Sequence, residues 1–128
     1  MLGFFKGKSK DNIIYSPCKG KVVPITEVSD PTFSEKVLGD GFAVIPSEGK
    51  IYAPADGEIS MVFDTVHAVT MTTCQLTELL IHIGLDTVTL KGEPFISHVS
   101  GGQQVKKGDL LLEADLEKIK SAGLDTIT

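Results

Sequence analysis

The chain contains no tryptophan, only two cysteines and no long apolar run. Cys18 and Cys74 are its cysteines, and their spacing matches neither a Cys-x-x-Cys motif nor a mixed Cys/His metal pattern. No segment approaches the roughly 20 consecutive apolar residues that span a bilayer. The first residues also lack the apolar region and cleavage site of a signal peptide. We therefore expect a cytoplasmic protein whose two thiols are free rather than joined in a disulfide.

Positive charge is also in deficit. The chain has 12 Lys and Arg against 17 Asp and Glu, a formal net charge of −5. This balance disfavours nucleic acids and anionic membranes as ligands and suits partners with a basic surface. A hydrophobic content of 41% with 23% charged residues is typical of one globular domain. We expect a flexible tail over residues 1–12, capable at most of a weak membrane contact, and one domain over residues 13–128.

Short apolar runs separated by glycine and proline make up most of the chain. They are rich in Val, Ile and Thr, which is typical of strands. The runs cover residues 13–17, 20–25, 41–46, 50–54, 57–63, 67–71, 78–84, 86–90 and 109–114. Two short helical turns are expected after the N-cap residues Asp30 and Asp115. The pattern predicts an all-β fold, an antiparallel β-sandwich or barrel with short helical turns.

A weak internal repeat runs through the first half of the chain. The sequence Ser16-Pro17-x-x-Gly20-Lys21-Val22-Val23 recurs as Ala53-Pro54-x-x-Gly57-Glu58-Ile59-Ser60. In each copy the proline fixes the entry to a turn and the glycine allows a bend before a strand. We interpret this as a duplicated β-motif. A second echo, GLDTVT at 84–89 and GLDTIT at 123–128, is interpreted as accidental, because Ser121 stands where the first copy has His82.

The histidines are the strongest candidates for chemistry. His98 lies beside a glycine-rich loop and is expected at the surface, whereas His67 and His82 lie in apolar, strand-like runs. A hairpin centred near residues 74 and 75 would place His67 directly opposite His82, with Cβ atoms about 4.5–5.5 Å apart. A single histidine in such a strand is more often a hydrogen-bonded core residue than a reactive one. Two in register make a functional site a serious hypothesis.

Paired imidazoles are suited to two kinds of chemistry. One ring can act as a nucleophile near neutral pH while the other donates a hydrogen bond to an incoming anion. Two imidazoles could also supply two of the three protein ligands of a catalytic zinc ion, with Asp64 or Asp86 as the third. A carbonyl near Gly84 could accept the Nδ1 proton of His82 and leave Nε2 unprotonated and facing outward. These residues alone leave both possibilities open.

One stretch carries a specific family resemblance. ELLIHIGLDTVTLKGEPF at 78–95, with Thr65-Val66-His67-Ala68 and FSEKVLGDGFAVIP at 33–46, closely resembles the glucose-type IIA component of the bacterial phosphoenolpyruvate-dependent sugar phosphotransferase system. The resemblance covers residues 13–127. It implies that His82 accepts a phosphoryl group on Nε2 from the carrier HPr and passes it to the IIB domain of a glucose-type sugar permease. It also implies that His67 hydrogen-bonds the phosphoryl oxygens.

The same resemblance assigns supporting roles. Thr65 would orient His67, Gly84 would hold the ring of His82, and Asp86 and Asp30 would lie near the surface that meets basic partners. The residues implied to form an apolar rim for docking are Phe33, Val37, Phe63 and Val88. No metal or other cofactor is implied, although His67 and His82 together could bind zinc opportunistically.

Two further expectations accompany the resemblance. Chains of this family usually continue past a GLDTIT-like segment with further strands, so we expect an open sheet edge here. Alternative functions are a regulatory protein that binds partners through the same face, or a biotinyl or lipoyl carrier domain, suggested by APADGEI and QQVKKGDLLLEA. A carrier domain needs a modified lysine at a hairpin tip, whereas Lys50 lies only three residues before Ala53.

Overall fold

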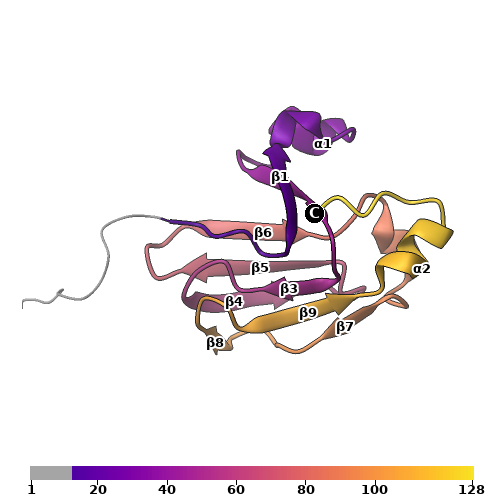
Figure 1. The fold of residues 1–128 in the computed structure, drawn as a ribbon. Helices are drawn as coiled ribbons and strands as arrows, with labels where there is room; N and C mark the ends of the chain where they lie inside the picture. Colours follow the sequence, from indigo (N-terminus) through magenta and orange to yellow (C-terminus); the bar gives the residue numbers. More distant parts are fainter. Residues whose placement is uncertain (1–12) are drawn as a thin grey trace, which may run out of the picture.

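The computed structural model describes residues 13–128, which form two antiparallel sheets and a separate hairpin (Figure 1). The four-stranded sheet has the order β6-β5-β4-β8 and the three-stranded sheet the order β3-β9-β7. The strands of the first are β6 (Glu78–His82), β5 (Ala68–Thr73), β4 (Gly57–Val62) and β8 (Gln104–Val105). Those of the second are β3 (Lys50–Tyr52), β9 (Leu110–Ala114) and β7 (Phe95–Ser97). The expected antiparallel sandwich is confirmed, and over the described residues neither sheet closes into a barrel.

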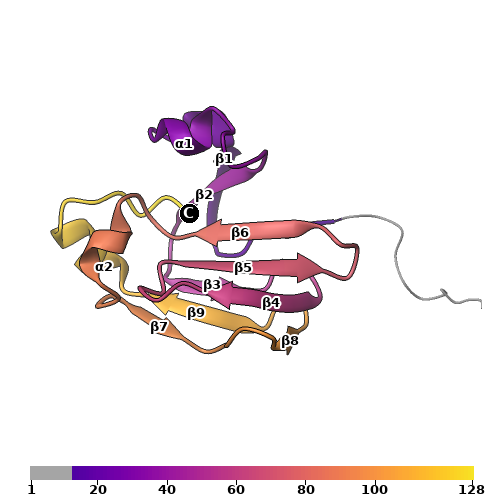
Figure 2. The same ribbon diagram turned by 180° about the vertical axis from the view of Figure 1, so that it is seen from behind.

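The separate hairpin pairs β1 (Gly20–Pro24) with β2 (Phe42–Pro46) and extends above the edge strand β6 (Figures 1 and 2). The connection between its strands contains two short helices, η1 (Ile25–Glu27) and α1 (Pro31–Ser34). The hairpin has a small apolar cluster of its own, built on Val23, Val28 and Ala43. It therefore acts as an arm that brings α1 to the end of β6.

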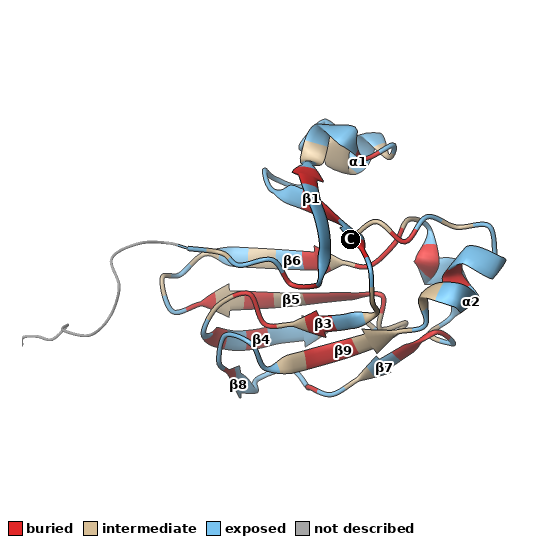
Figure 3. Ribbon diagram, viewed as in Figure 1, coloured by how far each residue is buried: buried red, intermediate tan, exposed pale blue. Residues whose placement is uncertain are grey.

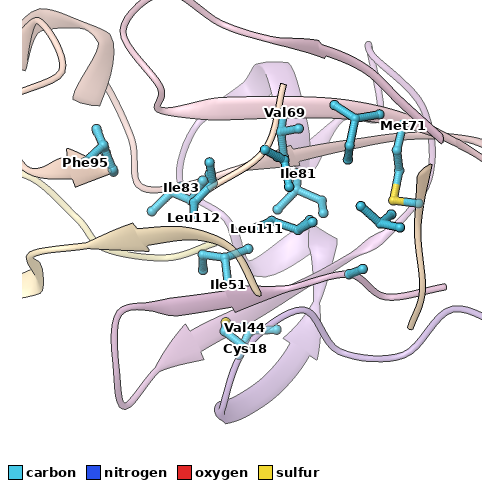
Figure 4. Packing of buried hydrophobic residues seen from close by; sticks show 14 of the residues in the cluster. Cys18, Val44, Ile51, Val69, Met71, Ile81, Ile83, Phe95, Leu111 and Leu112 are labelled. Atoms are coloured by element: carbon cyan, nitrogen blue, oxygen red, sulfur yellow. The ribbon is translucent and has the colours of Figure 1, made fainter. Parts of the chain in front are cut away.

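The core lies between the two sheets (Figures 3 and 4). Ile51, Leu111 and Leu112 from one sheet meet Val69 and Met71 from the other, and each is at most 1% exposed. Helix α2 (Leu116–Ser121) adds the fully buried Ile119 at one end. Burial of each large aliphatic side chain contributes about 1.5–3 kcal/mol, so this interior is the main source of stability.

The glycines of the duplicated motif occupy equivalent places in the structure, each at the start of a strand. Gly20 begins β1 and Gly57 begins β4. A Cβ atom built on Gly20 would lie 2.1 Å from the carbonyl oxygen of Ile45, and one on Gly57 would lie 2.3 Å from that of Thr72. In both copies, glycine is needed because the neighbouring strand approaches the α-carbon directly.

The two copies also bind each other. The amide of Tyr15 donates to the carbonyl of Pro54 at 3.0 Å, and the amide of Tyr52 donates to the carbonyl of Pro17 at 2.6 Å. These bonds are related by the same 37-residue offset as the sequence repeat. The repeat therefore includes the two tyrosines, and its copies pair reciprocally across a local pseudo-two-fold axis.

Two predicted strands are wrong. Residues 13–17 form no strand, although Tyr15 makes the backbone bond just described. The run at 86–90 forms instead a 3₁₀ helix, η2 (Thr87–Leu90). Its threonines explain the difference, because the hydroxyls of Thr87 and Thr89 bond back to the carbonyls of Ile83 and Asp86. Such local bonds compete with a strand ladder.

The helical turns agree with their predicted caps. The carboxylate of Asp30 accepts from the amide of Thr32 at 2.9 Å before α1, and that of Asp115 accepts from the amide of Lys118 at 3.1 Å before α2. Strands β7 and β8 are short, with three and two residues, and sequence periodicity did not indicate them.

Both cysteines are free, as predicted. Cys18 is buried, and its burial, with a smaller contribution from the charge of Glu48, raises the pKa of its thiol to about 11. Cys74 is exposed at the β5–β6 turn. Over residues 13–128 no helix has the length and apolar character needed to cross a membrane. The predicted tail and its membrane contact lie outside the described residues.

Candidate functional site

Two imidazole rings meet where β6 ends and β5 begins. The ring centroids of His67 and His82 are 5.0 Å apart, with the ring planes at 87°. The predicted register was wrong by one position, because Ala68 rather than His67 stands opposite His82 in the β5–β6 ladder. The hairpin is therefore centred on Gln75.

A tight turn before β5 explains why the rings still meet. Neighbouring positions in a regular strand face opposite sides of the sheet. His67 precedes the regular part of β5 and follows Val66, whose φ of +59° lies in the left-handed region. The amide of Val66 donates to the carbonyl of Phe63 at 2.7 Å, which closes the turn. The turn thus frees His67 from the alternation of the strand.

His82 is oriented by the backbone that follows it. Its Nδ1 lies 2.9 Å from the carbonyl oxygen of Gly84. A carbonyl can only accept, so Nδ1 carries the proton and Nε2 of the neutral ring keeps its lone pair. Gly84 has a φ of +77°, and a Cβ on it would lie 2.8 Å from the carbonyl oxygen of Asp125. Glycine is therefore required for the carbonyl to reach the ring.

His67 is held by a hydroxyl. Its Nδ1 lies 2.5 Å from Oγ1 of Thr65, and the residue is only 6% exposed. Phe63 packs edge-on against the ring, with centroids 5.4 Å apart and planes at 81°. These contacts fix the ring plane and direct the opposite nitrogen, Nε2, away from Thr65.

Both imidazoles are held in their neutral forms. Burial lowers the pKa of His67 below its ordinary value of 6.5, and the nearby His82 lowers it further. Burial also lowers the pKa of His82, and this outweighs the opposing effects of the Gly84 carbonyl, Asp30 and Asp86. At neutral pH the pair therefore offers one unprotonated nitrogen on each ring.

The match to known proteins agrees with this geometry. A model of the EIIA 1 family of the phosphoenolpyruvate-dependent sugar phosphotransferase system matches residues 12–128. This chain belongs to that family. It is 52% identical, over 123 residues and 96% of its length, to the glucosamine-specific EIICBA component of the phosphotransferase system of Bacillus subtilis. It spans 19% of that relative, about a fifth of its length.

A solved structure supports the same assignment. The fold of this EIIA chain is similar to that of glucose permease IIA from Mycoplasma capricolum, with a TM-score of 0.87 and 38% sequence identity. The likeness covers 99% of this chain and 81% of the other. The family and the β-sandwich predicted from the sequence are therefore confirmed.

The surroundings of His82 in this EIIA chain include an aromatic side chain from the hairpin arm. Phe33 in α1 lies 4.9 Å from the ring of His82, centroid to centroid. Asp30 begins this helix as its N-cap, so one residue both shapes α1 and places negative charge near His82. An apolar groove of about 1010 Å³ continues from Phe33 and His82 past Leu38.

The remaining predicted rim residues are surface positions. Val88 is 48% exposed and Val37 is 70% exposed. Asp86 is exposed and precedes η2 with a φ of +60°. Leu38, rather than the adjacent Val37, lines the groove.

Three other predictions concern a metal site, His98 and Lys50. No group of three His, Cys, Asp or Glu is placed to hold a metal within the part of the chain that the structure describes. Neither Asp64 nor Asp86 therefore completes a zinc site with the histidines. His98 lies at the surface as predicted, where its Nε2 is 2.7 Å from a carboxylate oxygen of Glu113. Lys50 begins β3, paired with Glu113, and is not at a hairpin tip.

Sequence reasoning missed the residues that hold Gly84. The carbonyls of Asp125 and Ile127 accept from the amides of Leu85 and Gly84. Both acceptors lie in the GLDTIT segment that was interpreted as an accidental echo, and it packs directly against GLDTVT. Thr87 is also buried here and was expected to lie in a strand. The sequence echo between the two segments was the signal that could have pointed to this contact.

Proposed function

We propose that this EIIA domain is a phosphocarrier that accepts a phosphoryl group on Nε2 of His82 from the phosphohistidine of HPr. It then passes the group to the IIB domain of a glucose-type sugar permease. The observation that carries the proposal is the 2.9 Å contact from Nδ1 of His82 to the carbonyl of Gly84. Because this contact fixes the tautomer, the nucleophilic lone pair is on Nε2.

The chemical step is a displacement at phosphorus. The Nε2 lone pair of His82 forms a bond to phosphorus while the bond from phosphorus to the donor imidazole breaks and its electrons return to that nitrogen. Transfer to the next acceptor repeats the exchange with His82 as leaving group. Such reactions depend mainly on positioning and on stabilising charge at the phosphoryl oxygens.

His67 is suited to stabilise that charge. When the hydroxyl of Thr65 donates to Nδ1, the proton of the neutral ring is on Nε2, which can then donate to a phosphoryl oxygen. The 5.0 Å separation of the two rings leaves the nitrogens close enough to share one phosphoryl group. With Thr65 as the donor, His67 would present a proton on Nε2 while Gly84 leaves Nε2 of His82 unprotonated.

The surface around His82 supports protein partners rather than a small substrate. Asp30 and Asp86 both act electrostatically on His82, and with the net charge of −5 they suit a basic partner surface. Phe33 and Phe63, which pack against the two rings, would exclude water from the phosphohistidine, and the exposed Val37 and Val88 would be free to contact a partner. A cytoplasmic location is part of the proposal because the two free thiols suit a reducing compartment.

Intact-mass measurement tests the proposal. After incubation with phosphoenolpyruvate, the first enzyme of the pathway and HPr, the wild type should gain one acid-labile, base-stable phosphoryl group. His82→Ala should gain none. His67→Ala should still be phosphorylated but should pass the group to IIB about 100-fold more slowly, because a charge-stabilising donor is lost.

The same assay separates the alternatives. An unlabelled wild type, or label retained in His82→Ala, would contradict the proposal, and an unlabelled protein that still binds its partners would favour the regulatory alternative. We also propose that no metal is required, because the two fixed imidazoles supply both nucleophile and donor. Treatment with a chelator should leave the rate unchanged, and a loss restored by zinc would overturn this part.

A further inference from the structure

The carbonyl that orients His82 belongs to a peptide group held on both sides. The oxygen of Gly84 accepts from Nδ1 of His82 at 2.9 Å. In the same peptide plane, the amide of Leu85 donates to the carbonyl oxygen of Asp125 at 3.0 Å. The three groups form a hydrogen-bonded chain, which polarises the Gly84 carbonyl and strengthens its bond to the imidazole.

The preceding peptide group is held in the same way, with a side chain as one partner. The amide of Gly84 donates to the carbonyl oxygen of Ile127 at 2.9 Å. The carbonyl oxygen of Ile83, on the other side of that peptide, accepts from the hydroxyl of Thr87 at 2.5 Å. Among residues 13–128, Thr87 is thus the side chain shown to anchor the link between His82 and the carbonyl that orients it.

Burial makes this hydroxyl hard to replace. Thr87 and Ile83 both have 0% exposure, so water does not reach the carbonyl of Ile83. The methyl group of Thr87 also limits the space at Gly84, where an added Cβ would lie 2.5 Å from Cγ2. Hydroxyl and methyl together fix the position of the Gly84 peptide.

We propose that Thr87 is a positioning residue for phosphoryl acceptance: its hydroxyl fixes the Ile83–Gly84 peptide and thereby keeps the His82 proton on Nδ1. Thr87 does not touch the phosphoryl group. The role in acceptance rests on the proposed function of His82, whereas the effect on the tautomer is independent of it.

Thr87→Val tests the hydroxyl with little change in volume. In ¹⁵N-detected NMR of the unphosphorylated protein, the wild type should carry the His82 proton almost wholly on Nδ1. In the variant we expect a mixture of the two tautomers. The rate of phosphoryl acceptance from HPr should fall about tenfold, because small displacements of a reacting atom are costly.

Thr89→Val provides a matched control. Thr89 lies in the same short helix, and its hydroxyl also bonds to a backbone carbonyl, that of Asp86 at 2.7 Å. It is exposed, and its bond does not involve the peptides that follow His82. This variant should keep the wild-type tautomer and a rate within about twofold of wild type, since the geometry of His82 is untouched.

A second pair of variants covers the case in which Thr87→Val does not fold. Thr87→Ser keeps the hydroxyl and loses the methyl, and Thr87→Ala loses both. The serine variant should retain the Nδ1 tautomer and the alanine variant should lose it. Equal tautomer fractions in the two variants would overturn the proposal, because the hydroxyl would then have no influence on His82.

The outcomes also separate this inference from the proposed function. A tautomer shift in Thr87→Val, in a protein that HPr does not phosphorylate, would support the positioning and reject the phosphocarrier role. An unchanged tautomer and rate in Thr87→Val, in a protein that is phosphorylated on His82, would reject the positioning and leave the role intact.

Discussion

At the scale of single residues, the site depends on two neutral imidazoles that are each held at Nδ1 by a different partner. A backbone carbonyl, which can only accept, holds His82, and a hydroxyl lies against Nδ1 of His67. Each partner engages Nδ1, so each ring presents Nε2 to the same space. The unprotonated nitrogen of His82 is thus chosen by the carbonyl of Gly84, and the orientation of His67 by Thr65.

Gly84→Ala should be strongly destabilising. The added Cβ would lie 2.5 Å from Cγ2 of Thr87 and 2.8 Å from the carbonyl of Asp125, at a φ of +77°. We expect a loss of about 2–4 kcal/mol in the free energy of unfolding, from overpacking and left-handed backbone strain. Urea denaturation measures this value.

Gly123→Ala is the control for that variant. Gly123 has nearly the same φ, +79°, but nothing lies within 4 Å of an added Cβ. It should lose only about 1 kcal/mol, the cost of a left-handed alanine. If both variants lost the same free energy of unfolding, the close contacts at Gly84 would not be the cause of the destabilisation.

The histidine pair should make stability depend on pH. Burial lowers the pKa of both rings below 6.5, so the unfolded chain binds protons more readily than the folded one. The stabilising effect of the neutral rings is present above pH 6.5 and is lost as the pH falls through their lowered pKa values.

Urea unfolding at about pH 5 and about pH 7.5 measures this dependence, since ordinary histidines titrate between these values. The free energy of unfolding of the wild type should be lower at the acidic pH. In the double variant His67→Gln, His82→Gln the difference should shrink, because only other groups still titrate. An undiminished difference would mean that the pair is not the cause.

At the scale of elements, the hairpin arm brings a helix against the ring of His82. Its helix α1 has only four residues, too few to be stable alone, and it depends on the Asp30 cap and on the cluster around Val23. It brings Phe33 to 4.9 Å from His82. A substitution in this short helix should therefore change the environment of His82.

Two substitutions at Asp30 separate its cap from its charge. Asp30→Ala should lower the free energy of unfolding by about 1 kcal/mol, whereas Asp30→Asn, an equally good cap, should change it by a few tenths at most. Both should lower the pKa of His82 further, because the charge of Asp30 raises it. NMR titration of His82 and urea unfolding give the two quantities.

Asp115→Ala is the matched control, because Asp115 caps α2 in the same way. It should lower stability by a similar amount, about 1 kcal/mol, and leave the pKa of His82 unchanged. A shift of that pKa in Asp115→Ala would show that loss of a cap anywhere perturbs the site.

At the scale of the whole molecule, the two sheets share one core and should unfold together. Leu112 in β9 is fully buried in the cluster that joins both sheets. Leu112→Ala should cost about 2–5 kcal/mol through the cavity it leaves. Tyrosine fluorescence and the NMR signals of His82 should show the same urea midpoint, as expected for one cooperative unit.

Ile96→Ala is the comparison for that core variant. Ile96 lies in β7 of the same sheet but is 60% exposed. Its loss should change stability by no more than about 0.5 kcal/mol. Separate midpoints for the two probes would contradict the single cooperative unit.

Local sequence patterns were enough to predict most of the strands, both helix caps, the repeat and the two histidines of the site. These features are local: proline and glycine fix turns, Asp30 and Asp115 accept from amides a few residues away, and His82 lies in a specific motif. The 3₁₀ helix at 87–90 was not predicted, because the alternation of apolar residues and threonine there also fits a strand. Only the threonine hydroxyls, bonded back to the chain, decide between the two.

How the histidines face each other, and what holds them, depends on contacts between segments that lie far apart in the chain. The register differs by one residue from the predicted one, and the rings meet because Val66 makes a left-handed turn. The carbonyls of Asp125 and Ile127, some 40 residues beyond Gly84 in the chain, fix its peptide. Such contacts join distant segments through packing, and a local pattern carries no information about which segments will meet.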